Sequence, residues 1–518
     1  MTRAPQASET TASETTASET NIDGDENSPR RDYAAALDGA IATRTESDSL
    51  GSMQIPADAY WGIHSARALE NFPITRRAIY NYPDLIRALA RVKQAAARAN
   101  AEVGVLKQST ADIIDRVCEE IVGGALHTEF CVGVIQGGAG TSTNMNANEI
   151  IANRGLELMG FAKGDYAKLH PIDDVNHSQS TNDVYPTAIK LAMVLGIHRL
   201  LAEHMLLTAS FAAKGQEFNH ILKIGRTQLQ DAVPMTLGQE FTGFAHTIAE
   251  DYDRLTETIP WLNEINMGAT AIGTGITADP RYAEAVRKHL TLVTGIDMVT
   301  SPDLIEATSD AGIFMTVSGT LKRAAVKLSK ICNDLRLLSS GPQAGFGEIT
   351  LPPRQAGSSI MPGKVNPVIP EVVNQVAFSV IGADATVTAA AEAGQLQLNA
   401  FEPVIAHSIL QSIAWMTNAC YTLRVNCIDG ITPNLERLAA QVETSVGVVT
   451  ALTPYIGYAA AATLAHTALT THASIADLVV SSGLMTAEDV ARVLSPERLS
   501  GMVPVTAAIT LPVLPPED

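Results

Sequence analysis

Apolar residues recur along most of the chain at helical spacing. A first helix is predicted between Asn81 and Gly104, where Pro83 and Asp84 suit the first turn. Its apolar positions follow one another at steps of 4, 3, 4 and 3, at Leu85, Leu89, Val92, Ala96 and Ala99. That period places them on one face, so the segment is predicted to be an amphipathic helix.

Five later segments are longer, and they are apolar on nearly every face. They cover roughly residues 185–213, 234–258, 310–338, 369–391 and 403–427. Each would run about 40 Å as a helix. A helix that is apolar all round has to be buried all round, in the centre of a bundle or between subunits. The pattern therefore predicts a long central five-helix bundle and a homo-oligomer in which bundles pack together.

Strand signals are sparse, so we expect an all-α (mainly α) protein. The first segment is rich in Ser, Thr, Glu and Asp, repeats Ala-Ser-Glu-Thr-Thr, and is predicted to be disordered. The predicted organisation is a tail over 1–49, an N-terminal domain over 50–182, the central bundle over 183–434, a small helical C-terminal domain over 435–502 and a Pro-rich tail over 503–518.

Composition and charge exclude several classes of protein. Among 518 residues, 46% are hydrophobic, and 36 bases against 55 acids give a net charge of −19. That charge opposes binding to nucleic acid, and an anionic substrate would need local positive potential. We expect no membrane span and no secretion signal, hence a cytoplasmic protein. The five scattered cysteines form no metal-ligand spacing and are predicted to be buried free thiols.

The segment Gly357-Ser-Ser-Ile-Met-Pro-Gly-Lys-Val-Asn-Pro367 carries the most informative chemistry. Its glycines and prolines predict a loop that leads directly into a long apolar helix. Ser358, Ser359, Lys364 and Asn366 put hydroxyls, one cation and an amide beside a helix N-terminus. Such a combination suits an anion, although a surface loop of the same composition is an ordinary alternative.

This loop resembles the signature loop of the fumarase/aspartase superfamily, whose members eliminate a group from a succinyl unit and release fumarate. Three further segments resemble the other signature regions, in the expected order. They are Gly137-Gly-Ala-Gly-Thr-Ser-Thr-Asn-Met-Asn-Ala-Asn148, Ser178-Gln-Ser-Thr-Asn-Asp183 and Gly225-Arg-Thr-Gln-Leu-Gln-Asp-Ala-Val-Pro234. The resemblance covers about residues 51–501 and implies the three-domain, mainly helical fold of the superfamily.

Other segments are more similar to the aspartase branch than to the fumarases. They include Ala68-Leu-Glu-Asn-Phe-Pro-Ile-Thr75, Leu304-Ile-Glu-Ala-Thr-Ser-Asp310 and Gly394-Gln-Leu-Gln-Leu-Asn-Ala-Phe-Glu-Pro403. Fumarases usually carry an acid/base histidine where this chain has Gln228. Ammonium is a good leaving group and needs no donated proton, whereas loss of hydroxide from malate benefits from a general acid. Gln228 therefore favours elimination of ammonia from L-aspartate.

The resemblance also implies roles for individual residues in a reversible anti elimination through an aci-carboxylate intermediate. Ser358 is the implied catalytic base. Thr141, Ser142, Ser180, Thr181 and Ser359 are implied to hold the β-carboxylate, Lys364 and Asn366 the α-carboxylate, and Asn182, Thr227 and Gln228 the amino group. It further implies a homotetramer whose active sites are each shared by three subunits. Glu371, His177 and His407 lie near the motifs without a clear role.

No cofactor is expected to be required, and no cluster of His, Asp or Glu has the spacing of a metal site. Activation by Mg²⁺ at a separate site stays open. Two alternatives also stay open at this point. One is a fumarate hydratase of the class II type; the other is a non-catalytic structural protein on the same scaffold.

Overall fold

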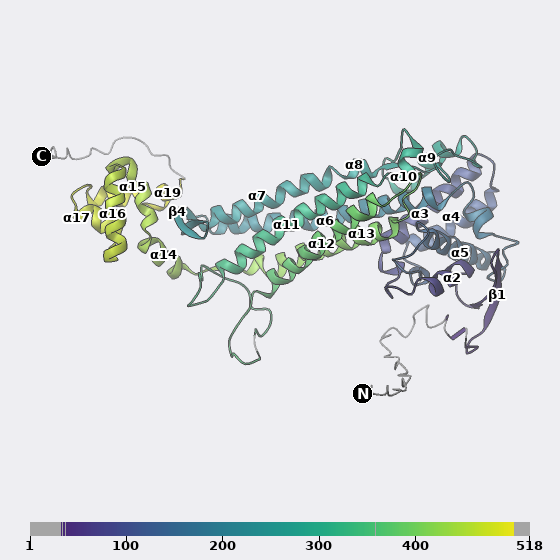
Figure 1. Cartoon of the computed structure of the whole chain (residues 1–518), viewed down its shortest axis with the longest axis horizontal. Helices are drawn as coiled ribbons and strands as arrows, with labels where there is room; N and C mark the ends of the chain where they lie inside the picture. Colours follow the sequence, from purple (N-terminus) through teal and green to yellow (C-terminus); the bar gives the residue numbers. More distant parts are fainter. Residues whose placement is uncertain (1–32, 34, 37, 358, 502–518) are drawn as a thin grey trace, which may run out of the picture.

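The computed structural model describes residues 33, 35–36, 38–357 and 359–501. A helical N-terminal domain lies at one end, long helices run through the middle, and a small helical domain lies at the other end (Figure 1). This mainly helical arrangement confirms the predicted fold class.

The N-terminal domain begins before residue 50. The predicted tail of residues 1–49 is wrong over its last part, because residues 43–48 form a strand in which Glu46 is buried; residues 1–32 lie outside the described residues. The helix predicted from residue 81 to 104 is confirmed as α3. The elements of this domain are β1 (Thr43–Asp48), β2 (Gly51–Pro56), α2 (Ile63–Asn71), η1 (Ile79–Asn81), α3 (Pro83–Glu102), α4 (Gln108–Val122), η2 (His127–Glu129), α5 (Thr141–Leu158) and η3 (Pro171–Val175).

All five predicted long helices are present and run along the middle of the molecule (Figure 1). They are α6 (Thr181–Glu217), α7 (Leu237–Thr256), α11 (Gly312–Leu338), α12 (Val368–Glu392) and α13 (Glu402–Asn426). The first starts earlier than its apolar pattern, because Ser180 and Asp183 form a capping box that begins the helix at Thr181. Pro186 lies near the start of α6, in its second turn.

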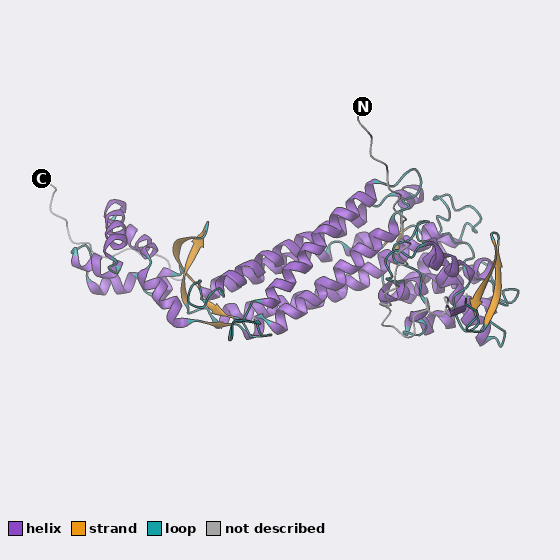
Figure 2. Cartoon of the chain, turned by 60° about the horizontal axis from the view of Figure 1, so that its bottom comes forward, coloured by secondary structure: helices purple, strands orange, loops and turns teal. Residues whose placement is uncertain are grey.

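Shorter elements connect the long helices. α8 (Ile259–Leu262), α9 (Tyr282–Thr294) and α10 (Leu304–Ser309) lie between α7 and α11, and α9 packs on α3. The strands pair in twos: β3 (Leu222–Thr227) with β4 (Gln230–Thr236), β5 (Glu264–Ile265) with β6 (Val299–Thr300), and β7 (Ile349–Thr350) with β8 (Thr432–Pro433). The two longest hairpins, β1–β2 and β3–β4, lie at opposite ends of the bundle (Figure 2).

The C-terminal domain has its own apolar core, which includes Leu452, Leu464, Val479 and Val490. Its helices are α14 (Leu435–Thr444), η5 (Val446–Val448), α15 (Val449–Ile456), α16 (Tyr458–Thr471), α17 (Ile475–Ser481), α18 (Ala487–Val493) and α19 (Pro496–Leu499), and η4 (Ile428–Gly430) precedes it. The Pro-rich segment 503–518 lies outside the described residues.

Two of the long helices, α6 and α12, are long and apolar enough to cross a membrane by length and composition alone. Helix α6 packs on α3, α7 and α13, so its apolar faces meet other helices. By contrast, α12 leaves Val372, Phe378 and Ile381 exposed in the single chain. All five cysteines are free and buried, as predicted.

Candidate active site

The motif at residues 137–148 forms a sharp turn into helix α5. Gly138, Ala139 and Gly140 all have positive φ angles, of 87°, 55° and 90°. A Cβ atom on Gly140 would lie 2.3 Å from the ring of Tyr185, so only glycine fits there. Thr141 and Ser142 then open the helix without a side-chain cap. In this first turn the Thr141 N–H donates to the Gly138 carbonyl at 2.9 Å and the Thr143 N–H to Gln136 Oε1 at 3.1 Å.

The motif at residues 178–183 opens helix α6. The Ser180 hydroxyl accepts from the Asn182 backbone N–H at 3.2 Å, and the Asp183 carboxylate accepts from the Ser180 N–H at 2.9 Å. The same carboxylate accepts from the N–H groups of Gly268 and Thr270 at 3.2 and 3.0 Å. Burial raises the pKa of Asp183 to about 7. Asp183 therefore fixes the start of α6 against the segment that follows β5.

The starts of α5 and α6 lie side by side. Asn144 Nδ2 donates to Thr181 Oγ1 at 3.1 Å, and this hydrogen bond joins the two motifs. Asn182 Nδ2 is held by the Ala271 carbonyl at 2.7 Å. Thr141, Ser142, Ser180, Thr181 and Asn182 thus gather on one surface, which we call the platform.

Thr227 and Gln228 do not join the platform within one chain. They lie in the β3–β4 hairpin, which follows the far end of α6 (Figure 1). That helix has 37 residues and therefore spans about 55 Å. Thr227, Gln228 and Leu229 are exposed, and the last two have positive φ angles of 53° and 62°. Gln228 and Leu229 are the two central residues of the hairpin turn, between the paired Thr227 and Gln230, where positive φ at both positions is the usual geometry of a type I′ turn.

The signature loop forms a third group, between α11 and α12. Gly357 N–H donates to the Lys364 carbonyl at 2.9 Å, and Asn366 Nδ2 donates to the Gly357 carbonyl at 2.7 Å. These two bonds close the base of the loop. Ser359 and Lys364 are exposed beyond it. Ser358, the predicted base, lies outside the described residues.

The remaining candidates, Glu371, His177 and His407, have contacts that serve the local structure. Glu371 lies in the first turn of α12, where a carboxylate complements the helix dipole. His177 Nδ1 contacts the Asp173 carbonyl at 2.8 Å, and His407 Nδ1 contacts the Tyr82 hydroxyl at 2.6 Å. In the described part of the chain, no group of three or more His, Cys, Asp or Glu side chains could hold a metal ion.

The structure adds a layer of residues that sequence reasoning missed. Asn144, Asn176 and Lys93 form a partly buried hydrogen-bond network behind the platform. Asn144 belongs to a motif that was singled out. Lys93 lies four residues after Leu89 and three before Ala96, which places it beside the apolar face of α3. Its role follows only from the residues that the fold packs against it.

Comparison with known proteins places these motifs in a family. Residues 51–382 match the family described as "Lyase", and residues 448–501 match "Fumarase C C-terminus". The aspartate ammonia-lyase of Pseudomonas aeruginosa is 56% identical over 459 residues, 88% of this chain and 97% of that protein. The aspartate ammonia-lyase of Escherichia coli K12 is 51% identical over 457 residues, covering 88% and 96%.

Solved structures agree with the sequence matches. A structure titled fumarate lyase:delta crystallin from Brucella melitensis bound to cobalt is similar to this chain with a TM-score of 0.86 and 53% identity, covering 89% of this chain and all of that one. The class II fumarase of Schistosoma mansoni has a TM-score of 0.84 and 31% identity, covering 89% and 99%. On the family match, the identities and the shared fold, this chain belongs to the fumarase/aspartase superfamily of lyases.

Proposed function

We propose that this protein is an aspartate ammonia-lyase, a carbon–nitrogen lyase that converts L-aspartate reversibly to fumarate and ammonia. The observation that carries the proposal is the identity of 51–56% to relatives of that name over nearly their whole length. The fumarase structure of the same fold is only 31% identical. We place the enzyme in the cytoplasm, since its apolar helices pack against one another in a bundle.

The platform suits the difficult step of this reaction. Removing a proton from C3 of aspartate turns the β-carboxylate into a doubly charged aci-carboxylate, which has to be stabilised as it forms. Thr141, Ser142, Ser180 and Thr181 supply hydroxyls at the starts of two helices that are already fixed in the structure. These groups can donate hydrogen bonds to carboxylate oxygen atoms without adding negative charge. Ser359 of the loop provides a further hydroxyl.

The signature loop supplies the base and the cation. Ser358 removes the C3 proton as an alkoxide, which the loop N–H groups, the start of α12 and Lys364 stabilise. Lys364 and Asn366 hold the α-carboxylate. Ser359 and Lys364 have exposed side chains, and we propose that the loop closes over bound substrate.

Gln228 supports ammonia rather than water as the leaving group. Its neutral amide cannot donate a proton to a leaving hydroxide, but it can accept a hydrogen bond from the substrate ammonium. Together with Thr227 and Asn182, it would surround the amino group.

The three groups of residues meet only if several chains combine. The platform and the β3–β4 hairpin lie at opposite ends of α6, and the signature loop follows the end of α11. We propose a homotetramer in which three subunits contribute to each active site. No cofactor is required in this scheme, and Mg²⁺ would act, if it activates, outside the site described here.

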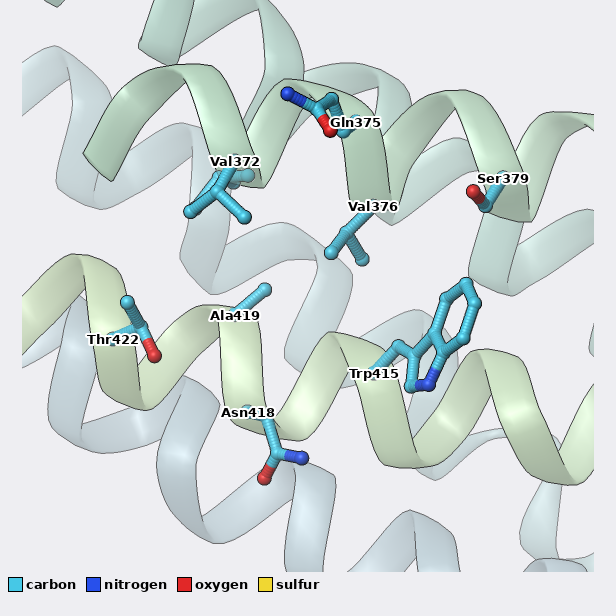
Figure 3. A pocket seen from close by; sticks show the side chains of 9 residues that line it. Val372, Gln375, Val376, Ser379, Trp415, Asn418, Ala419 and Thr422 are labelled. Atoms are coloured by element: carbon cyan, nitrogen blue, oxygen red, sulfur yellow. The ribbon is translucent and has the colours of Figure 1, made fainter. Parts of the chain in front are cut away.

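The outer face of α12 and α13 supports this assembly. Between them lies a groove of about 450 Å³, lined mainly by apolar side chains and by Gln375, Ser379, Asn418 and Thr422 (Figure 3). Trp415 stands at one end of the groove. With exposed Val372, Phe378 and Tyr421 nearby, this face has the apolar character of a helix-packing surface between subunits.

The activity is tested by following fumarate absorbance with purified protein and either L-aspartate or L-malate. We expect turnover of aspartate alone. Turnover of malate alone would identify a fumarase and would contradict the argument from Gln228. The absence of turnover with either substrate would contradict the lyase assignment.

The shared site is tested by mixing two inactive variants. Thr141→Ala and Ser358→Ala subunits, unfolded and refolded together, should regain activity, because some sites then take Thr141 from one chain and Ser358 from another. The oligomer size is measured by light scattering. Mixed tetramers that stay as inactive as the separate variants would contradict a site shared in this way.

A further inference from the structure

Lys93 is a lysine with no exposed surface, on helix α3 behind the platform. Its Nζ donates to Asn176 Oδ1 at 2.8 Å and to Gln179 Oε1 at 2.9 Å. Full burial of an ammonium group is unfavourable unless it is hydrogen-bonded and faces opposite charge. A buried lysine in this place therefore needs a structural reason.

Asn176 is the centre of the network that Lys93 enters. Its Oδ1 also accepts from Asn144 Nδ2 and Asn148 Nδ2, both at 3.1 Å, so three donors converge on one oxygen. Asn144 Nδ2 is shared with Thr181 Oγ1. The network thus joins α3, α5 and the segment before α6 to the first residue of α6 itself.

Two titratable groups act on the pKa of Lys93. The carboxylate of Asp183 attracts its ammonium group, and Cys118 of α4 is the other titratable group. Burial lowers the pKa of Lys93 to about 7, and the attraction of Asp183 opposes that shift. Asp183 holds the start of α6 from one side, and Lys93 holds the preceding segment through Asn176 and Gln179 from the other.

We propose that Lys93 is a positioning residue of the active site: through Asn176 and Asn144 it sets the relative placement of the α5 and α6 N-termini that carry Thr141, Ser142 and Ser180–Asn182. The inference rests on the proposed function of the platform. Removing the ammonium would leave Gln179 Oε1 without this donor in a partly buried site. Gln179 directly precedes Ser180, so the helix start would shift, and misplacement by about 1 Å is enough to slow a reaction about 100-fold.

The test is a double-mutant cycle on the full-length oligomer, with Lys93→Met, Asn144→Ala and both together. For Lys93→Met we expect kcat/KM for L-aspartate to fall about 100-fold and the Kd for succinate, an unreactive dicarboxylate, to rise about tenfold. The two losses in kcat/KM should be clearly less than multiplicative, because both substitutions break one connection. Lys107→Met is the matched control, since Lys107 is an exposed lysine of the same domain.

Three results would overturn the inference: unchanged kcat/KM in Lys93→Met, an unchanged succinate Kd, or losses that multiply. If Lys93→Met does not fold, Gln179→Leu removes one of the two acceptors and leaves the lysine in place. We expect it to lower kcat/KM about tenfold, and wild-type kinetics would overturn the inference. If the wild-type protein converts only malate, the proposed function is contradicted. The positioning role of Lys93 is then tested by comparing kcat/KM for malate between Lys93→Met and the wild type.

Discussion

The platform and the signature loop contain similar residue types and differ in how they are held. On the platform, Thr181 is buried, and Asp183 alone accepts three backbone N–H groups. The loop from Gly357 to Asn366 is closed at its base, while Ser359 and Lys364 are exposed. The platform is held by hydrogen bonds to neighbouring segments, whereas the loop presents Ser359 and Lys364 to solvent.

This difference fits the two tasks in the proposed reaction. Donors that stabilise the developing aci-carboxylate work best when they are already in place, since no reorganisation is then needed. The base and the cation have to reach a substrate that entered from solvent, so they are better carried on a segment that can move. Substitutions in the two regions should therefore have different kinetic signatures.

The largest effect is expected at Ser358. Ser358→Ala removes the proposed base, so kcat should fall by about 10³-fold or more, with little change in the Kd for succinate. Stopped assays of fumarate and calorimetry with succinate measure the two quantities. The matched variant Ser359→Ala should mainly weaken binding. Near-normal turnover in Ser358→Ala would contradict the assignment of Ser358 as the catalytic base.

A platform residue should give a smaller but still large loss. Asn182→Ala removes a side chain that is fixed on the Ala271 carbonyl and that we propose to contact the amino group. We expect kcat/KM for aspartate to fall about 100-fold, with a raised KM, because a preorganised contact is lost. If the loss appeared only as a lower melting temperature, Asn182 would be structural rather than substrate-binding.

The base of the loop can be broken without touching its reactive residues. A Cβ on Gly357 would lie 2.4 Å from the Lys364 carbonyl, so Gly357→Ala should open the base of the loop. We expect kcat/KM to fall about tenfold through poorer positioning, with an unchanged melting temperature, since the loop is exposed. Gly243→Ala on α7, where a Cβ meets nothing within 4 Å, is the control. Equal kinetics in both variants would contradict a positioned loop.

The smallest effect concerns pH and stability. Burial raises the pKa of Glu402, at the start of α13, from 4.5 to about 8. The folded protein then holds this proton more tightly than the unfolded chain, so the contribution to stability is present below pH 4.5 and is lost as pH rises towards 8. Between about pH 6 and pH 9, the melting temperature of Glu402→Gln should fall less than that of the wild type. The same fall in melting temperature in the variant and the wild type would contradict the raised pKa of Glu402. Glu392→Gln, at an exposed position, is the control.

Much of the fold follows from local sequence. The five long helices lie within a few residues of their predicted ranges, because an apolar run bounded by caps, Gly and Pro forms a helix in any environment that buries it. The β1 strand was missed, since residues 43–48 are polar and are held by pairing with β2 rather than by an apolar period. Such pairing depends on a partner and leaves a weak local signal.

The candidate site divides in the same way. Its motif residues were named from the sequence, and the structure brings five of them together on the platform through Asn144 and Asp183. The separation of Gln228 from the platform follows from the length of α6. The hydrogen-bond partners of Lys93 could not be foreseen, since Asn176 and Gln179 are more than 80 residues away in sequence.

The sequence by itself determined the helices, the apolar faces that have to be covered, the motifs and the family they belong to. These properties depend on residues close together along the chain or on short runs that can be recognised alone. Only the tertiary structure decided which motifs meet, which polar groups lie buried behind them, and which residues one chain cannot bring together. Those outcomes depend on the distances between helices, which are set by packing over the whole molecule.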